Sequence, residues 1–312
     1  MKEPVRLYQL IDMEDPQIVF NETLTTALLT VPGLDLGALR EIFEDIYRLF
    51  DGGYPGFREC NTKYHDLRHT MDTLLAMARL MHGANEEGES LDARHVTLGL
   101  ISALMHDAGY IQDDADFEGT GAKYTLVHIN RSIDFMKDYL ARKGFSSSDF
   151  EVCRNTLLCT GLNIAVQKIK FESLQNETIG KMLGTADLAG QMADRNYLEK
   201  LPFLFHEFIE GGVKGFESEL DLLRKTIHFY ALTKKRFSDE MGGANRFFRV
   251  HFVARWGIDR DLYGEAMENH MNYLASILKY HVEDYRLYLR RENMMEELIT
   301  RVNKPEKMAV GH

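Results

Sequence analysis

Proline is scarce in this chain, and apolar residues recur at helical spacing along nearly all of it. Only six prolines occur in 312 residues, and apolar side chains repeat three and four positions apart. That spacing lines one face of an α-helix, whereas a half-buried strand would alternate apolar and polar residues. Hydrophobic residues make up 45% of the sequence, which is enough for a large buried core. We therefore predict an all-α, multi-helical fold.

Apolar stripes and end signals place the individual helices. The segment 94–107 is hydrophobic on most sides and is expected to be a central buried helix. Ser148 to Glu151 has the capping-box pattern ahead of another helix, and Gly161 suits the left-handed position after its end. The last helix is long enough to contribute to a homodimer, although it could equally pack on its own core. The predicted helices span residues 36–50, 66–81, 94–107, 124–143, 152–160, 177–194, 197–210, 217–239, 244–256 and 262–295.

A single domain accounts for most of the chain. No low-complexity tract, internal repeat or linker is evident, and the clearest break in the helical pattern is the acidic loop 113–121. We assign residues 34–300 to one domain. Residues 1–33 are expected to form an N-terminal extension, and residues 301–312 a C-terminal tail.

Charge and cysteine usage exclude several kinds of partner. The formal net charge is −11, and no concentrated Lys/Arg stripe is present, so binding to nucleic acid is not expected. No apolar run approaches the roughly 18 residues of a membrane span, and the first residues lack a signal-peptide pattern. The three cysteines are odd in number and lack metal-finger spacing, which indicates free thiols in a reducing compartment. The expected location is the cytoplasm.

Histidines and aspartates occur in an order that suggests a reaction centre. If residues 64–69 begin a helix, His65 and His69 lie one turn apart on the same side. One of them could then bind a metal while the other transfers protons. An adjacent pair, His106 and Asp107, follows 37 positions after His69 at the end of an apolar helix. These two side chains can diverge around one ion, and the second oxygen of Asp107 can bridge to another.

Asp187 adds a second carboxylate. It interrupts the small and apolar segment 185–190, which should pack inward. A buried carboxylate is costly unless a cation or a hydrogen-bond donor meets it. A hydrogen-bonded structural aspartate is the usual outcome at such a position. With His69, His106 and Asp107 also present, we instead predict that Asp187 is a metal ligand.

These residues resemble a known superfamily. His69, the His106-Asp107 doublet and Asp187 resemble the H…HD…D signature of the HD-domain metal-dependent phosphohydrolases. Tyr64-His65 with His69 and Asp72 resembles the Y-H-N-x-x-H-x-x-D motif of the class I cyclic-nucleotide phosphodiesterase catalytic domain, with Asp66 in place of the usual Asn. The resemblance spans about residues 60–190.

The resemblance implies a fold, a metal centre and a reaction. It implies an HD-type helical bundle in which His69, His106, Asp107 and Asp187 bind the first metal and Asp107 bridges to a second. Zn, Mn, Fe or Co would suit the first site, and Mg or Mn a second site filled largely by water. The reaction would be hydrolysis of a small phosphorylated substrate, most plausibly a phosphodiester or nucleotide, by a metal-activated hydroxide. His65 would protonate the leaving oxygen.

Two departures from the phosphodiesterase pattern bear on the second metal and on the substrate. The doublet continues as Ala108-Gly109-Tyr110 and lacks the histidine of the family's H-D-x-x-H-P-G, which puts the second metal in question. No glutamine follows Gln191 to select a purine, although Phe248 could stack on a base and Asn245 could offer an amide. An aromatic stripe such as the one containing Phe248 is more often part of the core.

Three further residues are candidates for roles around this centre. His128 could hydrogen-bond to a metal ligand or contact the substrate, but a hydrogen-bonded core histidine fits equally well. Asp72, one turn beyond His69, would either orient a metal ligand or lie exposed on its helix. Tyr64 belongs to the same motif and is expected to lie beside the metal ligands or the substrate.

Two alternatives to a phosphodiesterase remain open at this point. A nucleotide monophosphatase or an alarmone-type hydrolase could use the same scaffold and metal ligands. A metal-stabilised ligand-sensing module without catalysis would explain the missing histidine, but it would not require His65 beside the metal.

Overall fold

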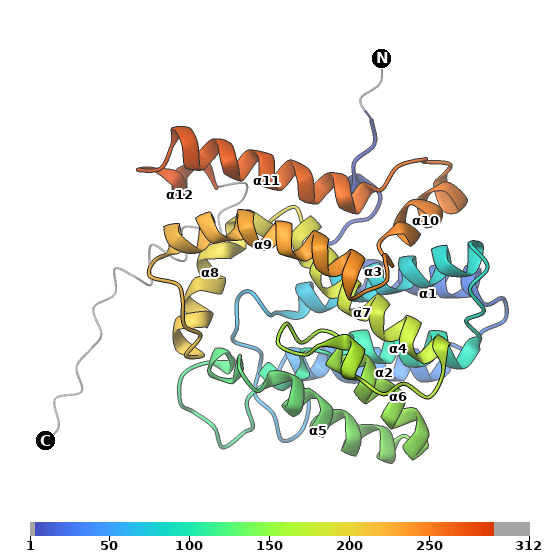
Figure 1. The fold of residues 1–312 in the computed structure, drawn as a ribbon. Coiled ribbons are helices and arrows are strands. Elements are labelled where there is room, and N and C mark those ends of the chain that lie inside the picture. Colours follow the sequence, from blue (N-terminus) through green and yellow to red (C-terminus); the bar gives the residue numbers. More distant parts are fainter. Residues whose placement is uncertain (1–3, 290–312) are drawn as a thin grey trace, which may run out of the picture.

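A computed structural model describes residues 4–289, which fold into helices joined by loops (Figure 1). Four short 3₁₀ helices, η1 to η4, span Leu7–Gln9, Ala108–Tyr110, Gly121–Tyr124 and Val166–Lys168. Within residues 4–289 the only β-type pairing is an isolated bridge between Phe57 and Asp113, so the all-α prediction is confirmed. The α-helices are α1 (Pro16–Thr30), α2 (Gly37–Phe50), α3 (Leu67–Glu86), α4 (Ala93–Met105), α5 (His128–Arg142), α6 (Ser147–Leu158), α7 (Leu174–Ala193), α8 (Tyr197–Glu210), α9 (Glu219–Asp239), α10 (Arg246–Trp256), α11 (Leu262–Tyr280) and α12 (Tyr285–Tyr288).

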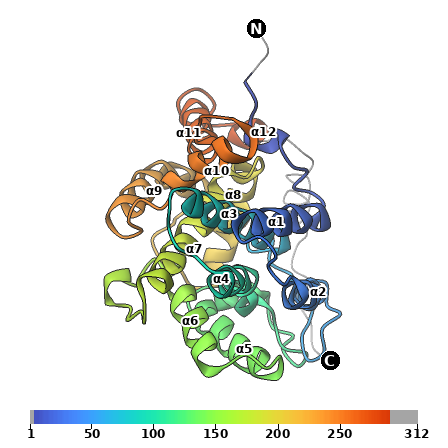
Figure 2. The same ribbon diagram turned by 90° about the vertical axis from the view of Figure 1, so that its right-hand side faces the viewer.

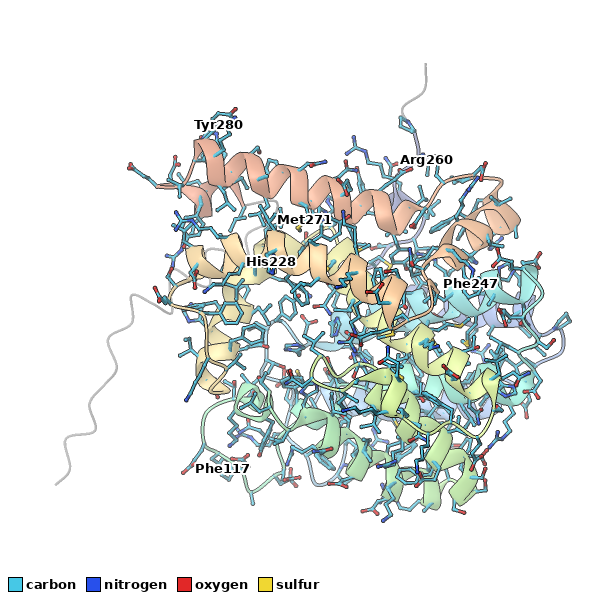
Figure 3. All side chains as sticks on the ribbon, in the orientation of Figure 1. Phe117, His228, Phe247, Arg260, Met271 and Tyr280 are labelled. Carbon is cyan, nitrogen blue, oxygen red and sulfur yellow. The ribbon has the colours of Figure 1, made fainter. Side chains whose placement is uncertain are left out.

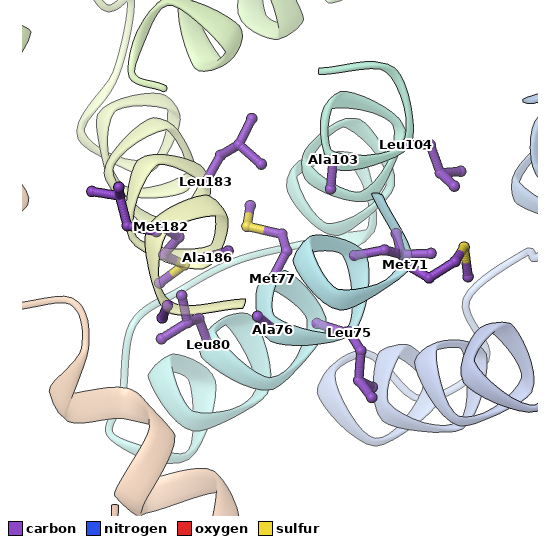
Figure 4. Close-up of a cluster of buried hydrophobic side chains, with 14 of the residues drawn as sticks. Met71, Leu75, Ala76, Met77, Leu80, Ala103, Leu104, Met182, Leu183 and Ala186 are labelled. Atoms are coloured by element: carbon purple, nitrogen blue, oxygen red, sulfur yellow. The ribbon is translucent and has the colours of Figure 1, made fainter. Parts of the chain in front are cut away.

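Helix α3 lies at the centre of the molecule. Figure 2 shows α1, α4, α7 and α10 around it, and every residue from His69 to Ala84 is buried. A helix covered on all sides carries mostly apolar or small residues, and α3 also buries the polar side chains of His69, Asp72, Arg79 and His82. In Figure 4, residues of α3 meet Ala103 and Leu104 of α4 and Met182, Leu183 and Ala186 of α7. The predicted central helix, 94–107, corresponds to α4, which is buried along most of its length but lies beside α3.

The contact between α3 and α10 depends on Gly83. A Cβ atom at this position would lie 2.0 Å from the carbonyl oxygen of Phe247 and 3.1 Å from the amide nitrogen of His251. Both atoms belong to the backbone of α10, which cannot swing aside as a flexible side chain could. The close approach of these two helices therefore requires a residue without a side chain.

We expect Gly83→Ala to destabilise the protein by about 1–3 kcal/mol, because the overpacking outweighs the better helix propensity of alanine. The free energy of unfolding is measured by chemical denaturation, with circular dichroism as the signal. Gly53→Ala is the matched control, since its Cβ would meet nothing closer than 3.8 Å at an exposed site. Equal stability of the two variants would show that α10 can retreat from α3 without cost.

Several predicted helix boundaries are wrong for identifiable reasons. The N-cap of α6 is Ser146, two residues before the predicted Ser148, because Ser146 Oγ accepts from the amide of Asp149 at 3.1 Å and the Asp149 side chain accepts from the amide of Ser146 in return. Gly161 does not adopt a positive φ. The predicted helix 124–143 starts at His128 instead, after the separate turn η3.

The predicted long helix 262–295 is also interrupted. Helix α11 ends at Tyr280, and a separate short helix, α12, follows from Tyr285 to Tyr288. The rest of the predicted helix, from residue 290, lies outside the described residues, as does the predicted C-terminal tail. A single long helix that could supply a dimer interface is therefore not observed.

The N-terminal residues take part in the main body of the protein. Residues 16–30, assigned from the sequence to an extension, form α1, which packs along α3 and buries Val19, Phe20, Leu24 and Ala27 in the core. Cys60, Cys153 and Cys159 are free thiols, as predicted. Within the described part of the chain, no helix is both long and apolar enough to cross a membrane.

Candidate metal centre

The start of α3 and the end of α4 bring three predicted ligands together. Asp66 caps α3 by accepting from the amide of His69 at 2.9 Å, and it also faces Lys200 Nζ at 3.3 Å. The helix therefore begins at Leu67, and His65 precedes it, contrary to the prediction that both histidines lie on one helix. Their rings nevertheless lie close together, with centroids 5.8 Å apart.

Three potential ligand residues, His69, His106 and Asp107, cluster inside the protein, and Asp187 lies beside them. His69 Nε2 lies 3.2 Å from Asp107 Oδ2, 3.2 Å from Asp187 Oδ1 and 3.2 Å from His106 Nε2. His106 Nε2 lies 3.4 Å from Asp107 Oδ2 and 3.9 Å from Asp187 Oδ1. Ligand atoms about 2.1 Å from a shared ion lie about 3.0–3.4 Å apart in octahedral or tetrahedral geometry. The spacing of His69, His106 and Asp107 therefore fits a single transition-metal ion, whereas the 3.9 Å between His106 Nε2 and Asp187 Oδ1 is longer than this range.

Hydrogen bonding and burial at the two ligands of the doublet also fit a cation. His106 Nδ1 donates to the carbonyl oxygen of Ala103 at 2.8 Å, which leaves the lone pair of the neutral ring on Nε2, facing the centre. Asp107 Oδ2 is buried and makes no hydrogen bond within residues 4–289. A buried carboxylate oxygen of this kind is costly unless positive charge compensates it.

The pKa values of Asp107 and His69 also indicate that the cluster requires positive charge. Burial alone would raise the pKa of Asp107, but His106 and His69 hold it well below its usual range. Burial alone would lower the pKa of His69, but Asp107 and Asp187 raise it to about 10. Without a metal, His69 therefore carries the cation that the two carboxylates require. A divalent ion would meet the same requirement.

Asp187 is held in place by a chain of hydrogen bonds that leads to Tyr64. Gln191, one turn further along α7, donates from Nε2 to Asp187 Oδ1 at 3.1 Å. Its Oε1 accepts from the hydroxyl of Tyr64 at 2.7 Å. Through Gln191, Tyr64 is therefore linked to the predicted ligand Asp187. Tyr64 is only 3% exposed, so it cannot readily contact a substrate. Polar partners of this kind orient metal ligands in proteins.

His65 lies at the edge of the centre and is fixed by Glu207 of α8. Its Nδ1 donates to Glu207 Oε2 at 2.7 Å, and Glu207 Oε1 accepts from the amides of Lys63 and Tyr64 at 2.7 Å each. Glu207 is 5% exposed. Burial and three hydrogen-bond donors together fix the position of its carboxylate. This arrangement leaves Nε2 of His65 as the ring nitrogen that can exchange a proton with another molecule.

His128 lies on the other side of Asp107. Its Nδ1 donates to the carbonyl oxygen of Thr125 at 2.7 Å, and its Nε2 lies 3.8 Å from Asp107 Oδ1. The ring of Tyr110 stacks on both His65 and His128, with centroid distances of 4.3 and 4.6 Å, and the two histidine rings lie 6.3 Å apart. Gly109 permits this approach, since a Cβ there would lie 2.0 Å from the carbonyl oxygen of His128. Asp107 thus presents one oxygen to the ligand cluster and the other to His128.

The structure does not bring Phe248 or Asn245 to this centre. Phe248 is 1% exposed and stacks on Tyr263 in the core, with centroids 4.0 Å apart, so it cannot stack on a base. Asn245 directly precedes α10, and α10 contacts α3 at Gly83, about 21 Å along the helix from His69 at 1.5 Å per residue. Figure 3 shows Phe247 on the side of the molecule away from Phe117 and the acidic loop.

Asp72 does not orient His69. It is buried rather than exposed, but His69 Nδ1 has no hydrogen-bond partner within residues 4–289. Asp72 lines a separate cavity with Arg68 and Arg79 instead. Neither role predicted for Asp72 is therefore observed.

Sequence reasoning missed Glu207 and Gln191. Glu207 lies 142 residues from His65, and no local motif joins them. The available signal was a carboxylate in the apolar stripe of a predicted helix, since Glu207 follows Phe203 by one turn. The same reasoning identified Asp187. Gln191 could have been noticed one turn after Asp187.

Comparison with known proteins identifies one similarity. Residues 114–241, less than half of the chain, match a family model described as Npun_R2479-like. This segment contains His128, Asp187 and Glu207 but begins after His106 and Asp107. The description names no activity or ligand. No curated protein matches the chain.

Proposed function

We propose that this protein is a metal-dependent phosphohydrolase, with an HD-type centre, that cleaves a small phosphodiester or nucleotide. The observation that carries the proposal is the cluster of His69, His106 and Asp107, with Asp187 3.2 Å from His69, beside a histidine fixed by a buried glutamate. Two imidazoles and two carboxylates suit Zn, Mn, Fe or Co. A divalent cation held there would polarise a phosphoryl oxygen and lower the pKa of a water molecule.

The residues around this ligand set have separate roles in the proposed reaction. Asp107 Oδ1 and His128 Nε2 face each other outside the cluster, where a second ion such as Mg or Mn would find one carboxylate oxygen and one imidazole. His65 donates a proton from Nε2 to the leaving oxygen, and Glu207 holds its ring in the required orientation. The side chains of Asp187, His65 and His128 are 14%, 15% and 21% exposed, so this side is where a substrate can enter.

A substrate panel tests this proposal. Purified protein loaded with Mn is assayed with cyclic nucleotides, nucleoside monophosphates and polyphosphorylated nucleotides. Hydrolysis of cyclic nucleotides supports a phosphodiesterase, whereas release of phosphate from monophosphates supports a nucleotidase at the same centre. Stoichiometric bound metal with no turnover on any member would contradict a hydrolase and favour a sensing module.

We expect Glu207→Gln to lower kcat by about 10–100-fold and to leave KM nearly unchanged, because the substitution preserves shape but removes the charge that supports His65. Glu217→Gln, at an exposed position, is the control. An unchanged kcat in Glu207→Gln would show that the charge of Glu207 does not support His65.

A further inference from the structure

The ring of Tyr110 lies against both histidines that flank the proposed metal ligands. Its centroid is 4.3 Å from that of His65, with the ring planes 11° apart, and 4.6 Å from that of His128, with the planes 22° apart. Tyr110 is 2% exposed, so it is not available to a substrate. Tyr110 can therefore affect the proposed reaction only through the groups around it.

Two sets of hydrogen bonds hold Tyr110 in place. Arg131 of α5 donates from Nε to the carbonyl oxygen of Gly109 at 2.9 Å and from Nη2 to that of Ile111 at 3.0 Å, so it binds the backbone on either side of Tyr110. At the other end of the side chain, the Tyr110 hydroxyl hydrogen-bonds to the side chain of Thr125. Because the backbone and the hydroxyl are both held, the ring between them forms a rigid surface.

A hydrogen bond at one nitrogen does not by itself fix the plane of the His65 ring. The Cβ–Cγ bond of histidine has a broad torsional preference, and the bond from Nδ1 to Glu207 Oε2 at 2.7 Å tolerates a range of angles. Rotation about Cβ–Cγ changes the direction of Nε2. The parallel ring of Tyr110 restricts this rotation, since a turned imidazole would press its edge into the tyrosine. The rings of Tyr64 and His69 meet His65 at 66° and 84° and provide no parallel surface.

We propose that Tyr110 is a positioning residue for the general acid, and that its ring, rather than its hydroxyl, directs Nε2 of His65 toward the leaving oxygen. Glu207 holds the edge of the imidazole, and Tyr110 holds its plane. Misplacing a reacting group by about 1 Å can cost roughly 100-fold in rate. The proposal rests on the proposed hydrolase activity and adds a residue on which protonation of the leaving group depends.

Two substitutions separate the ring from the hydroxyl. Tyr110→Phe keeps the flat ring, and we expect its kcat to stay within about twofold of that of the unaltered protein. Tyr110→Leu removes the flat surface and should lower kcat on a nucleotide phosphodiester by about 10–100-fold, with bound metal and KM nearly unchanged. Tyr110→Met, whose flexible side chain fills irregular gaps, replaces Tyr110→Leu if the latter fails to fold.

Tyr139→Leu is the matched control for the loss of a buried tyrosine. Tyr139 is 1% exposed, stacks on Phe135 and donates from its hydroxyl to Asp45 at 2.7 Å. It contacts none of the histidines of the centre. Tyr139→Leu should therefore lower the free energy of unfolding, as Tyr110→Leu does, but should keep its kcat. An equal fall of kcat in the two variants would assign the effect to general packing and would overturn the proposal.

The leaving group shows whether Tyr110 acts through His65. A nitrophenolate leaves without a proton, whereas a ribose oxygen needs one. The loss in Tyr110→Leu should therefore shrink to about threefold or less on a nitrophenyl phosphodiester. On the nucleotide substrate, Tyr110→Leu should add almost nothing to the loss already caused by His65→Asn. An equal loss on both substrates, or full addition of the two losses, would overturn the proposal.

A nuclear magnetic resonance signal tests the positioning without turnover. In protein with isotope-labelled histidine, the bond to buried Glu207 should protect the Nδ1 proton of His65 from solvent exchange, and His65→Asn identifies the signal by removing it. Tyr110→Phe and Tyr139→Leu should keep this signal, and Tyr110→Leu should broaden or lose it. An unchanged signal in Tyr110→Leu would overturn the proposal even in an active hydrolase. Absence of turnover in the unaltered protein contradicts the hydrolase instead, while the signal still decides whether Tyr110 positions His65.

Discussion

Asp107→Ala is expected to abolish metal binding at the cluster and to lower metal-dependent hydrolysis by at least about 10³-fold, while the helical fold is retained. Asp107 Oδ2 faces both His69 Nε2 and His106 Nε2, and its second oxygen faces His128. Removing this side chain therefore removes one ligand from the first site and the proposed bridge to the second. Changing a partner of a ligand typically costs 10–100-fold, so losing a bridging ligand should cost more.

Two measurements on the same samples separate this effect from unfolding. Metal content after dialysis should fall in Asp107→Ala, whereas far-ultraviolet circular dichroism should stay unchanged. Asp114→Ala, in the exposed acidic loop, is the matched control and should keep both its metal and its activity. Full activity of Asp107→Ala would contradict the proposal that hydrolysis takes place at this centre. Loss of activity in Asp114→Ala as well would show that the acidic loop is also required for activity.

His65→Asn is the second substitution with a large expected effect. We expect kcat to fall by about 10²–10⁴-fold for an ordinary phosphodiester, which is the usual contribution of a general acid. Bound metal should be unaffected, because His65 hydrogen-bonds to Glu207 and lies outside the ligand cluster. His228→Gln, an exposed histidine on α9, is the control.

The leaving group decides whether His65 supplies a proton. A nitrophenolate leaves without protonation, whereas a ribose or alkyl oxygen does not. With a nitrophenyl phosphodiester, His65→Asn should therefore lose far less activity than with a nucleotide substrate. An equal loss with both substrates would assign His65 to substrate binding or positioning and would contradict its role as the acid.

Local patterns in the sequence were sufficient for the fold class and for finding the four candidate ligands that the structure brings close together. The spacing of apolar residues placed α8 at its observed bounds and most other helices to within a few residues. His69, His106, Asp107 and Asp187 were identified from their order along the chain, and the structure brings them within hydrogen-bond or ion-pair distance. Their proximity follows because α3 packs against both α4 and α7.

Long-range contacts explain what the sequence could not provide. The bond between Glu207 and His65 joins α8 to the loop before α3, and neither segment has a pattern that names the other. Phe248 was a reasonable candidate for base stacking because aromatic residues line both cores and pockets, and only tertiary packing places it against Tyr263. Asp72 lies one turn from His69, but rotation around the helix directs it to the cavity with Arg79 instead.

Metal reconstitution tests the central claim most directly. The protein is stripped of metal, reloaded separately with Mn, Mg, Zn or Fe, and assayed on the phosphoester panel together with Asp107→Ala. We predict turnover that returns with at least one of these ions, with at least one ion bound per chain, and that is absent in the variant. Turnover that is indifferent to metal removal, or equal in Asp107→Ala, would contradict a metal-dependent hydrolase at this centre.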